Sequence, residues 1–159
     1  MHTKIRHADH TVKTGLISFS EGTRFTLSKY ASSINWCKEH NHLIMKHILY
    51  PRVRGFVATV SALRHTKHVR AVCDMTIAYA HGNNFMQAPS SWQTIPTADL
   101  AKEGYKFYIH DGRYDTNELP ESGLSKWLKE RWIKKGERLE MLRDKLAVER
   151  NEEEDVLCK

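Results

Sequence analysis

The sequence predicts an α/β fold, in which a mixed sheet is flanked by helices and followed by a long C-terminal helix. Short apolar runs alternate with segments of helical period between residues 15 and 80. An alternating run at residues 105–115 predicts another strand, and leucines recur at helical spacing after Ser122. The order strand, helix, strand, helix, strand is typical of a sheet with crossover connections. With 159 residues, the chain has the length of one domain with a hydrophobic core.

The first predicted elements follow a polar, histidine-rich start. Residues 1–14 show neither helical nor strand period, so we expect a disordered lead-in there. Residues 15–20, "GLISFS", have the composition of a short buried strand. Thr26 can cap the helix that follows. The apolar positions of that helix recur at spacings of three and four: Leu27, Tyr30, Ala31, Ile34 and Cys37.

A second strand and a second helix are predicted next. Residues 47–52, "HILYPR", form the strand, and Pro51 marks its end because proline cannot donate to a central ladder. Residues 55–64, "GFVATVSALR", favour a helix. Residues 69–80 are β-branched and apolar, and predict a third strand. The predicted helix has one apolar stripe, formed by Phe56, Val57, Val60 and Leu63.

The remainder contains an irregular stretch, a strand and a helix. Residues 81–104 are rich in Gly, Asn, Pro and Ser, and predict an excursion from the core. The strand at residues 105–115 follows, and a long helix begins after Ser122 and ends in an acidic tail. The apolar face of this helix is formed by Leu124, Leu128, Trp132, Leu139, Leu142 and Leu146.

The formal net charge of +6 is unevenly distributed. Residues 1–104 carry 13 Lys/Arg against 6 Asp/Glu, whereas residues 105–159 carry 12 against 13. A basic surface favours a polyanion, an anionic membrane face or a phosphorylated small molecule. Cys37, Cys73 and Cys158 have no close spacing and follow no secretory signal, so we expect reduced thiols. No stretch approaches the ~20 apolar residues that span a bilayer, and we expect no transmembrane segment.

Residues 21–24, "EGTR", follow the first predicted strand and combine groups that suit an anion. Gly22 lets the backbone approach closely, Thr23 offers a hydroxyl, and Arg24 offers a fork that fits a phosphate. Glu21 would repel a phosphate unless it pairs with an arginine or accepts a hydrogen bond from a ligand hydroxyl. A turn with a surface Glu21–Arg24 pair is the alternative, because four residues match by chance.

A second basic stretch surrounds the next predicted strand end. "YPRVRGF" begins at Tyr50, and residues 46–70 contain six Lys/Arg, no acidic residue and three interleaved histidines. If both strand ends present arginines at the same sheet edge, they form one positive pocket. A solvated basic face is the alternative explanation.

Three stretches together resemble a known family: "LISFSEGTRFTLSKYASSINWCKEHN", "KHILYPRVRGFVATVSALR" and "AVCDMTIAYAHG". They are similar to the later half of the glycerolipid acyltransferases, the 1-acylglycerol-3-phosphate acyltransferases of the fungal and plant type. The match extends from about Gly15 to about Leu146. It implies a lead-in over 1–14, a partial acyltransferase domain over 15–114 and a C-terminal helical segment with an acidic tail over 115–159.

The resemblance implies transfer of a fatty acyl group from acyl-CoA to lysophosphatidate, giving phosphatidate, with acyl-CoA as co-substrate and no bound cofactor. It also implies that the reaction takes place at a membrane surface, that of the endoplasmic reticulum. The family pattern assigns glycerol-phosphate binding to Glu21, Gly22, Thr23 and Arg24. It places Pro51 near the acyl donor, and Arg52 matches the basic residue that commonly follows this proline.

The catalytic pair of the family, H-x-x-x-x-D upstream of the EGTR motif, is not found in this sequence. The spacing occurs once, at His110 and Asp115, some ninety residues after the motif, and we reject it as a coincidence. In the family the histidine deprotonates the acceptor hydroxyl and the aspartate orients it. We therefore expect a truncated or inactive form that retains the ligand site.

The charge and the histidine spacing of the sequence also suggest other functions. The basic pI of about 9.3 would suit a nucleic-acid module, but the tryptophans occupy no base-presenting strand or zinc-finger spacing. The histidine pairs at 40 and 42 and at 65 and 68 lack the further ligands of a metal site. A noncatalytic module that binds a phosphate ligand, a membrane or a nucleic acid is therefore the alternative to an enzyme.

Overall fold

The computed structural model describes residues 15–157, so the predicted lead-in and the last two residues of the acidic tail lie outside the described residues. Helices and strands follow in the chain order α1 (Leu27–Glu39), α2 (Val53–Leu63), β1 (Ala71–His81), β2 (Asn84–Met86), α3 (Ser91–Thr94), β3 (Tyr105–Asp115) and α4 (Leu124–Leu157).

The three strands form an antiparallel sheet in the order β2-β1-β3. β1 pairs with β3 along its whole length, from Ala71 opposite Asp115 to His81 opposite Tyr105. Gly82, with a φ of 58°, lies in the tight turn between β1 and β2. The prediction of a mixed sheet with crossovers is therefore wrong, because each strand returns beside its neighbour in the opposite direction.

The first two predicted strands account for this error. Residues 15–20 and 47–52 are irregular, and neither pairs with the sheet. Leu16, Ile17 and Phe19 have 64%, 81% and 82% of their surface exposed. A short apolar run predicts burial, but it forms a strand only where a neighbouring strand supplies its hydrogen bonds.

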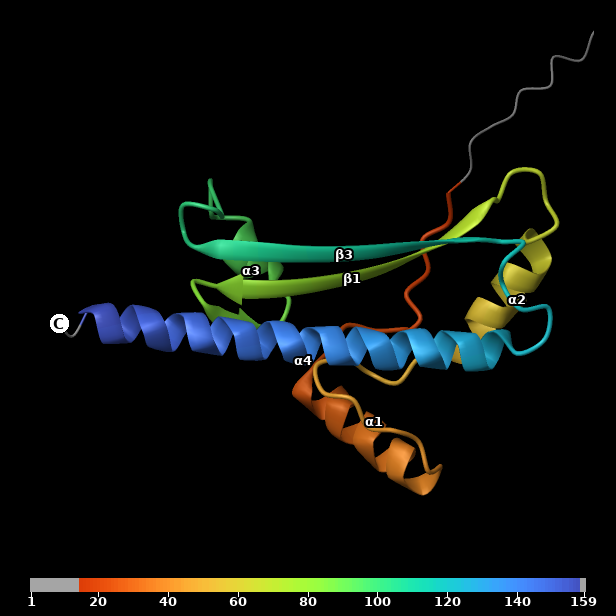
Figure 1. The fold of residues 1–159 in the computed structure, drawn as a ribbon, viewed down its shortest axis with the longest axis horizontal. Coiled ribbons are helices and arrows are strands. Elements are labelled where there is room, and N and C mark those ends of the chain that lie inside the picture. Colours follow the sequence, from red (N-terminus) through yellow and green to blue (C-terminus); the bar gives the residue numbers. More distant parts are fainter. Residues whose placement is uncertain (1–14, 158–159) are drawn as a thin grey trace, which may run out of the picture.

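Helix α4 organises the molecule. Its 34 residues extend for about 51 Å along the sheet (Figure 1). α4 contacts α2 near its beginning, and β1 and β2 further along. The predicted apolar face is confirmed: five of its residues are at least 94% buried, and Leu142 is partly buried. These five are Leu124, Leu128, Trp132, Leu139 and Leu146.

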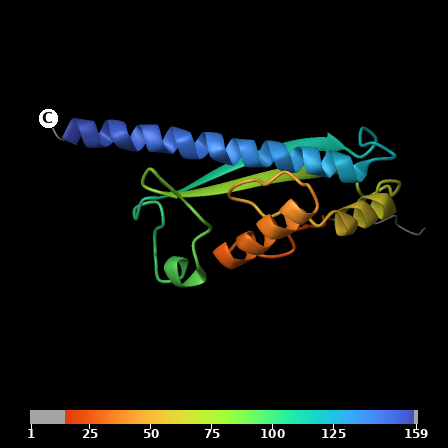
Figure 2. The ribbon, with the colours of Figure 1, turned by 90° about the horizontal axis from the view of Figure 1, so that it is seen from below.

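α2 lies beside the beginning of α4, whereas α1 runs obliquely to α4 and makes no close backbone contact with it among the described residues (Figures 1 and 2). Thr26 caps α1, as predicted, by accepting a hydrogen bond from the Lys29 backbone N–H. α2 begins two residues before the predicted helix and buries Phe56 and Val60. At its end, the Arg64 guanidinium donates to three carbonyls of the loop before α4, those of Thr116, Leu119 and Pro120.

The sheet face turned away from α4 carries exposed apolar side chains. Met75 and Ile77 of β1 are 51% and 44% exposed, and Phe107 and Ile109 of β3 are 48% and 64% exposed. Ile77 pairs with Ile109 across the strands. Among residues 15–157, no helix has the length and apolar character required to cross a bilayer.

Candidate functional site

The two sequence blocks that resemble the acyltransferases meet in space. We call residues 21–24 the EGTR block and residues 50–52 the YPR block. The backbone N–H of Arg52 donates to the carbonyl of Ser20 at 2.6 Å. Gly22 has a φ of 70°, and a Cβ atom there would lie 2.8 Å from Cδ of Arg52. The two blocks therefore lie at one place, but loops position them, so the expectation of two strand ends at one sheet edge is wrong.

Arg52 also occupies the N-cap position of α2. No side chain caps this helix end and no acidic residue lies in its first turn. The first N–H groups of a helix have no intrahelical partner and favour an anion. In the described part of the chain, no carboxylate forms an ion pair with the exposed Arg52 guanidinium. Pro51 is buried beside it, so a rigid backbone presents a free positive charge.

Glu21 points to the interior instead. Burial raises the pKa of its carboxyl above the ordinary value, while a hydrogen bond from the Leu49 backbone and the charge of Lys135 act in the opposite direction. The Glu21 carboxyl therefore lies beside the backbone of the segment before Pro51, and Lys135 of α4 acts on it only through its charge. Lys135 also forms an ion pair with Asp74 of β1 at 3.3 Å.

Thr23 and Arg24 make contacts within the chain as well. The Lys29 ammonium donates to the Thr23 hydroxyl. Nη2 of Arg24 donates to the carbonyl of Ala88 at 2.5 Å, across 64 residues of sequence. A guanidinium has five N–H donors, so the other groups of Arg24 stay available to a ligand.

Comparisons with known proteins find relatives among the acyltransferases. No family model and no solved structure matches the chain. Mouse lysocardiolipin acyltransferase 1 is 32% identical over 126 residues, which are 78% of this chain and 31% of the relative. Mouse 1-acyl-sn-glycerol-3-phosphate acyltransferase epsilon is 32% identical over 122 residues, 74% of this chain and 33% of the relative. The chain is a homologue of the glycerolipid acyltransferases.

A plant relative supports the same assignment. Arabidopsis thaliana 1-acyl-sn-glycerol-3-phosphate acyltransferase 3 is 28% identical over 141 residues, 85% of this chain and 34% of the relative. This acyltransferase homologue thus spans about a third of the length of the curated relatives it matches.

Segment 43–50 connects the YPR block of the acyltransferase homologue to α4. The carbonyl of Leu49 accepts a hydrogen bond from the Trp132 indole at 2.9 Å, in a buried position. The His47 imidazole lies 2.7 Å from Glu140; burial lowers the pKa of His47, and Glu140 opposes this effect. Sequence reasoning missed these partners because they follow the YPR block by more than 80 residues, and no local pattern links them.

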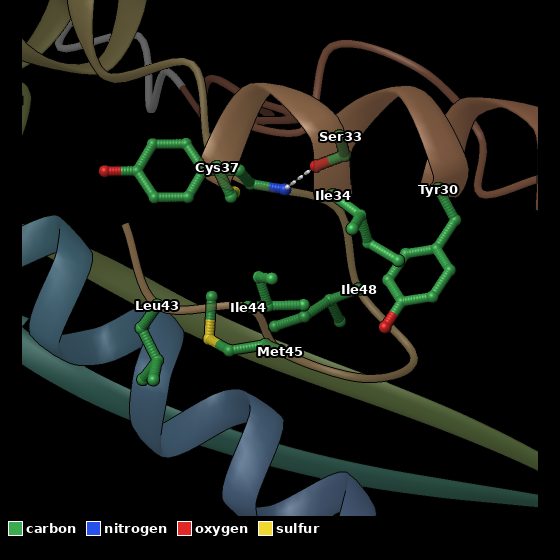
Figure 3. A pocket seen from close by; sticks show the side chains of 9 residues that line it. Tyr30, Ser33, Ile34, Cys37, Leu43, Ile44, Met45 and Ile48 are labelled. Carbon is green, nitrogen blue, oxygen red and sulfur yellow. Dashed lines mark hydrogen bonds between the residues drawn. The ribbon is translucent and has the colours of Figure 1, made fainter. Parts of the chain in front are cut away.

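A small pocket separates α1 from the same segment (Figure 3). Its volume of about 10 Å³ suits one water molecule and excludes a lipid substrate. The Ser33 hydroxyl accepts a hydrogen bond from the Tyr50 backbone N–H at 3.2 Å on its rim. Cys37 also lines it and is 3% exposed, and burial raises the pKa of its thiol. This agrees with Cys37 as a core residue.

The only H-x-x-x-x-D spacing of the homologue lies on β3. His110 pairs with Thr76, and Asp115 pairs with Ala71 at the far end of the ladder. Residues five apart on a strand point to opposite faces and are about 17 Å apart. His110 and Asp115 cannot share a proton, so rejecting them as a catalytic pair is correct.

Proposed function

We propose that this chain supplies the acceptor-binding part of an acyltransferase that moves a fatty acyl group from acyl-CoA to lysophosphatidate, giving phosphatidate. Two of the relatives are named 1-acyl-sn-glycerol-3-phosphate acyltransferases, which supports this reaction class. Because the acceptor is a lipid, the reaction takes place at a membrane surface. The family suggests the membrane of the endoplasmic reticulum.

The observation that carries the proposal is the position of Arg52. Its guanidinium lies over Gly22 at the uncapped beginning of α2, without a carboxylate partner within the described residues. A phosphate there would accept a bidentate pair from Arg52 and hydrogen bonds from the first N–H groups of α2. Arg24 can add a further donor from the EGTR block. Pro51 fixes the backbone at this point, and we assign it to the neighbourhood of the acyl donor.

Glu21 has a different part in this proposal. Because its carboxyl is largely buried and accepts a hydrogen bond from the Leu49 backbone, it positions Gly22 and Thr23. A side chain bonded to the interior does not bring its negative charge against the phosphate. Glu21 is therefore a positioning residue, whereas Gly22, Thr23, Arg24 and Arg52 face the ligand.

We further propose that these 159 residues bind the acceptor without turning it over. Acyl transfer requires a base that removes the proton of the acceptor hydroxyl while the acyl carbonyl is attacked and CoA thiolate departs. His110 and Asp115 cannot perform this step, because they lie on opposite faces of β3. We assign the base to residues that are not in this sequence.

The test is binding of lysophosphatidate to the chain, compared with monoacylglycerol, which lacks the phosphate. Arg52→Gln should weaken lysophosphatidate binding roughly 10- to 100-fold. Lys67→Gln, an exposed charge near the other end of α2, is the matched control and should change the affinity less than twofold. Equal affinity for both lipids, or competition by DNA, would contradict the proposal. Acyl-CoA turnover by the chain alone would contradict the assignment of the base.

A further inference from the structure

A groove of about 250 Å³ lies between α4 and the strands β1 and β3. α4 contacts β1 and β2, whereas no close backbone approach to β3 is found among the described residues. The groove occupies the space left beside β3. Its floor is formed by Thr76 and Ala78 of β1 and by Tyr108 of β3, and its wall by Arg138 and Leu142 of α4.

Two polar side chains in this groove have unsatisfied atoms. Among the described residues the hydroxyl of Thr76 has no hydrogen-bond partner, although this residue is only 5% exposed. Nη1 of Arg138 is buried and also lacks a partner within residues 15–157. Buried polar groups are nearly always hydrogen-bonded in native proteins, so each unsatisfied group calls for an explanation.

The preceding turn of α4 shows how a basic side chain in this position can be paired with an acidic residue of β1. Lys135, three residues before Arg138, forms an ion pair with Asp74 of β1 at 3.3 Å. Asp74 and Thr76 are two residues apart on β1 and therefore face α4 together. Lys135 pairs with the carboxylate of Asp74, whereas Arg138 has no carboxylate partner in the described part of the chain and lines the groove together with Thr76. The groove thus has a positive charge without a counter-ion.

His110 of β3 also lines the groove, and most of its other lining residues are apolar. Ala78 and Leu139 are buried, and Leu142 is partly buried. Met141, which is 63% exposed, lies at the opening of the groove. A guanidinium at one point and aliphatic side chains around it complement a molecule with an anionic head and an aliphatic chain. The volume is below that of pockets for drug-sized ligands, so the groove suits a short stretch of chain.

We propose that this groove binds a single-chain amphiphile with an oxyanion head, whose head accepts hydrogen bonds from Arg138 and Thr76 while its chain lies on Ala78, Leu139 and Leu142. The head can be a fatty carboxylate or a lipid phosphate, because both accept the same bidentate pair from arginine. No residue of the EGTR or YPR block lines the groove. It is therefore a second site, and it does not depend on the proposed acyltransferase function.

The experiment is calorimetric titration of the 159-residue chain with decanoate and with decyl phosphate, below their micelle concentrations. Decanol and acetate are the controls that lack the charge or the chain. We expect both acids to bind at least tenfold more tightly than either control, and the tighter of the two identifies the head group. Equal binding of decanol and the acids would overturn the proposal.

Substitutions locate the binding. Arg138→Gln should weaken decanoate binding at least tenfold, and Thr76→Val, which is close in shape, about threefold. Lys134→Gln removes the same charge from an exposed position of α4 and should have less than a twofold effect. Circular dichroism establishes that each variant is folded. Unchanged affinity for decanoate in the folded Arg138→Gln variant would overturn the proposed site. Weaker decanoate binding in the Arg52→Gln variant would overturn it as well, because decanoate would then occupy the phosphate site at Arg52.

Discussion

Gly22 lies directly against the side chain of Arg52, where a Cβ atom would stand 2.8 Å from Cδ and 2.9 Å from Nε of the arginine. The contact joins two blocks that lie about 30 residues apart in the sequence. Gly22 also has a φ of 70°, in the left-handed region that other residues adopt at a cost. Both the backbone conformation and the close approach therefore require glycine at this position.

Gly22→Ala is expected to lower the free energy of unfolding by about 1–2 kcal/mol, the cost of a left-handed conformation for alanine. The added methyl group would also displace Arg52 and weaken lysophosphatidate binding. Urea denaturation and the binding titration measure the two effects separately.

Gly55→Ala is the matched control for this substitution. Gly55 lies in the first turn of α2, and a Cβ atom there would meet no atom within 4 Å. Alanine should stabilise the helix by about 0.5–1 kcal/mol and leave Arg52 in place. The same sign of stability change in both variants would contradict the role assigned to Gly22.

Trp132→Phe tests the connection between α4 and the YPR block. The substitution removes the indole donor of the buried 2.9 Å hydrogen bond and leaves the Leu49 carbonyl without it. We expect a loss of about 1–3 kcal/mol in the free energy of unfolding, the usual cost of an unsatisfied buried group. Trp92→Phe is the control, because Trp92 is 88% exposed. A loss of equal size in both variants would exclude a special role for this bond.

Local patterns in the sequence predicted the three long helices α1, α2 and α4 and the long strands β1 and β3, but not the short β2 and α3 within residues 81–104. The cap at Thr26, the stripe of α2 and the apolar face of α4 depend on neighbouring residues, and all three are confirmed. The strand at residues 105–115 is confirmed with its bounds. Such features are determined within one or two turns of the chain, where periodicity is informative.

Features that depend on distant partners could not be predicted in this way. Residues 15–20 and 47–52 have the composition of strands, but whether they pair depends on neighbours that local composition does not reveal. The burial of Glu21 beside the Leu49 backbone depends on the packing of a segment that local patterns do not connect to it. The meeting of the EGTR and YPR blocks was expected from two strand ends at one sheet edge, but the blocks meet through loops.

Glu21→Gln should change the pH dependence of stability. The pKa of Glu21 is raised above its ordinary value of 4.5, so the native state holds this proton more tightly than the unfolded state. The contribution of Glu21 to stability is complete below this value and decreases as the pH rises through the folded-state pKa. Glutamine cannot ionise and does not show this decrease.

Urea denaturation of the original chain and of Glu21→Gln between about pH 4 and about pH 7 measures the difference in their free energies of unfolding. The stability of Glu21→Gln relative to the original chain should increase with pH. Glu137→Gln, at an exposed position of α4, is the control. A relative stability that falls with pH would show that Lys135 and Leu49 outweigh the burial of Glu21.

Lys135→Met tests the ion pair that joins α4 to β1. Lys135 and Asp74 are 12% and 10% exposed, and methionine would leave the Asp74 carboxylate without its partner. Removal of one member of a buried pair costs about 3–5 kcal/mol, so we expect a loss of that order in urea denaturation. Because Lys135 also acts on Glu21, the variant should bind lysophosphatidate more weakly. Lys145→Met is the matched control: Lys145 pairs with Glu149 on the same helix at 71% and 40% exposure, and its loss should cost less than about 1 kcal/mol. If the two variants were equally stable, the Lys135–Asp74 pair would not hold α4 to the sheet.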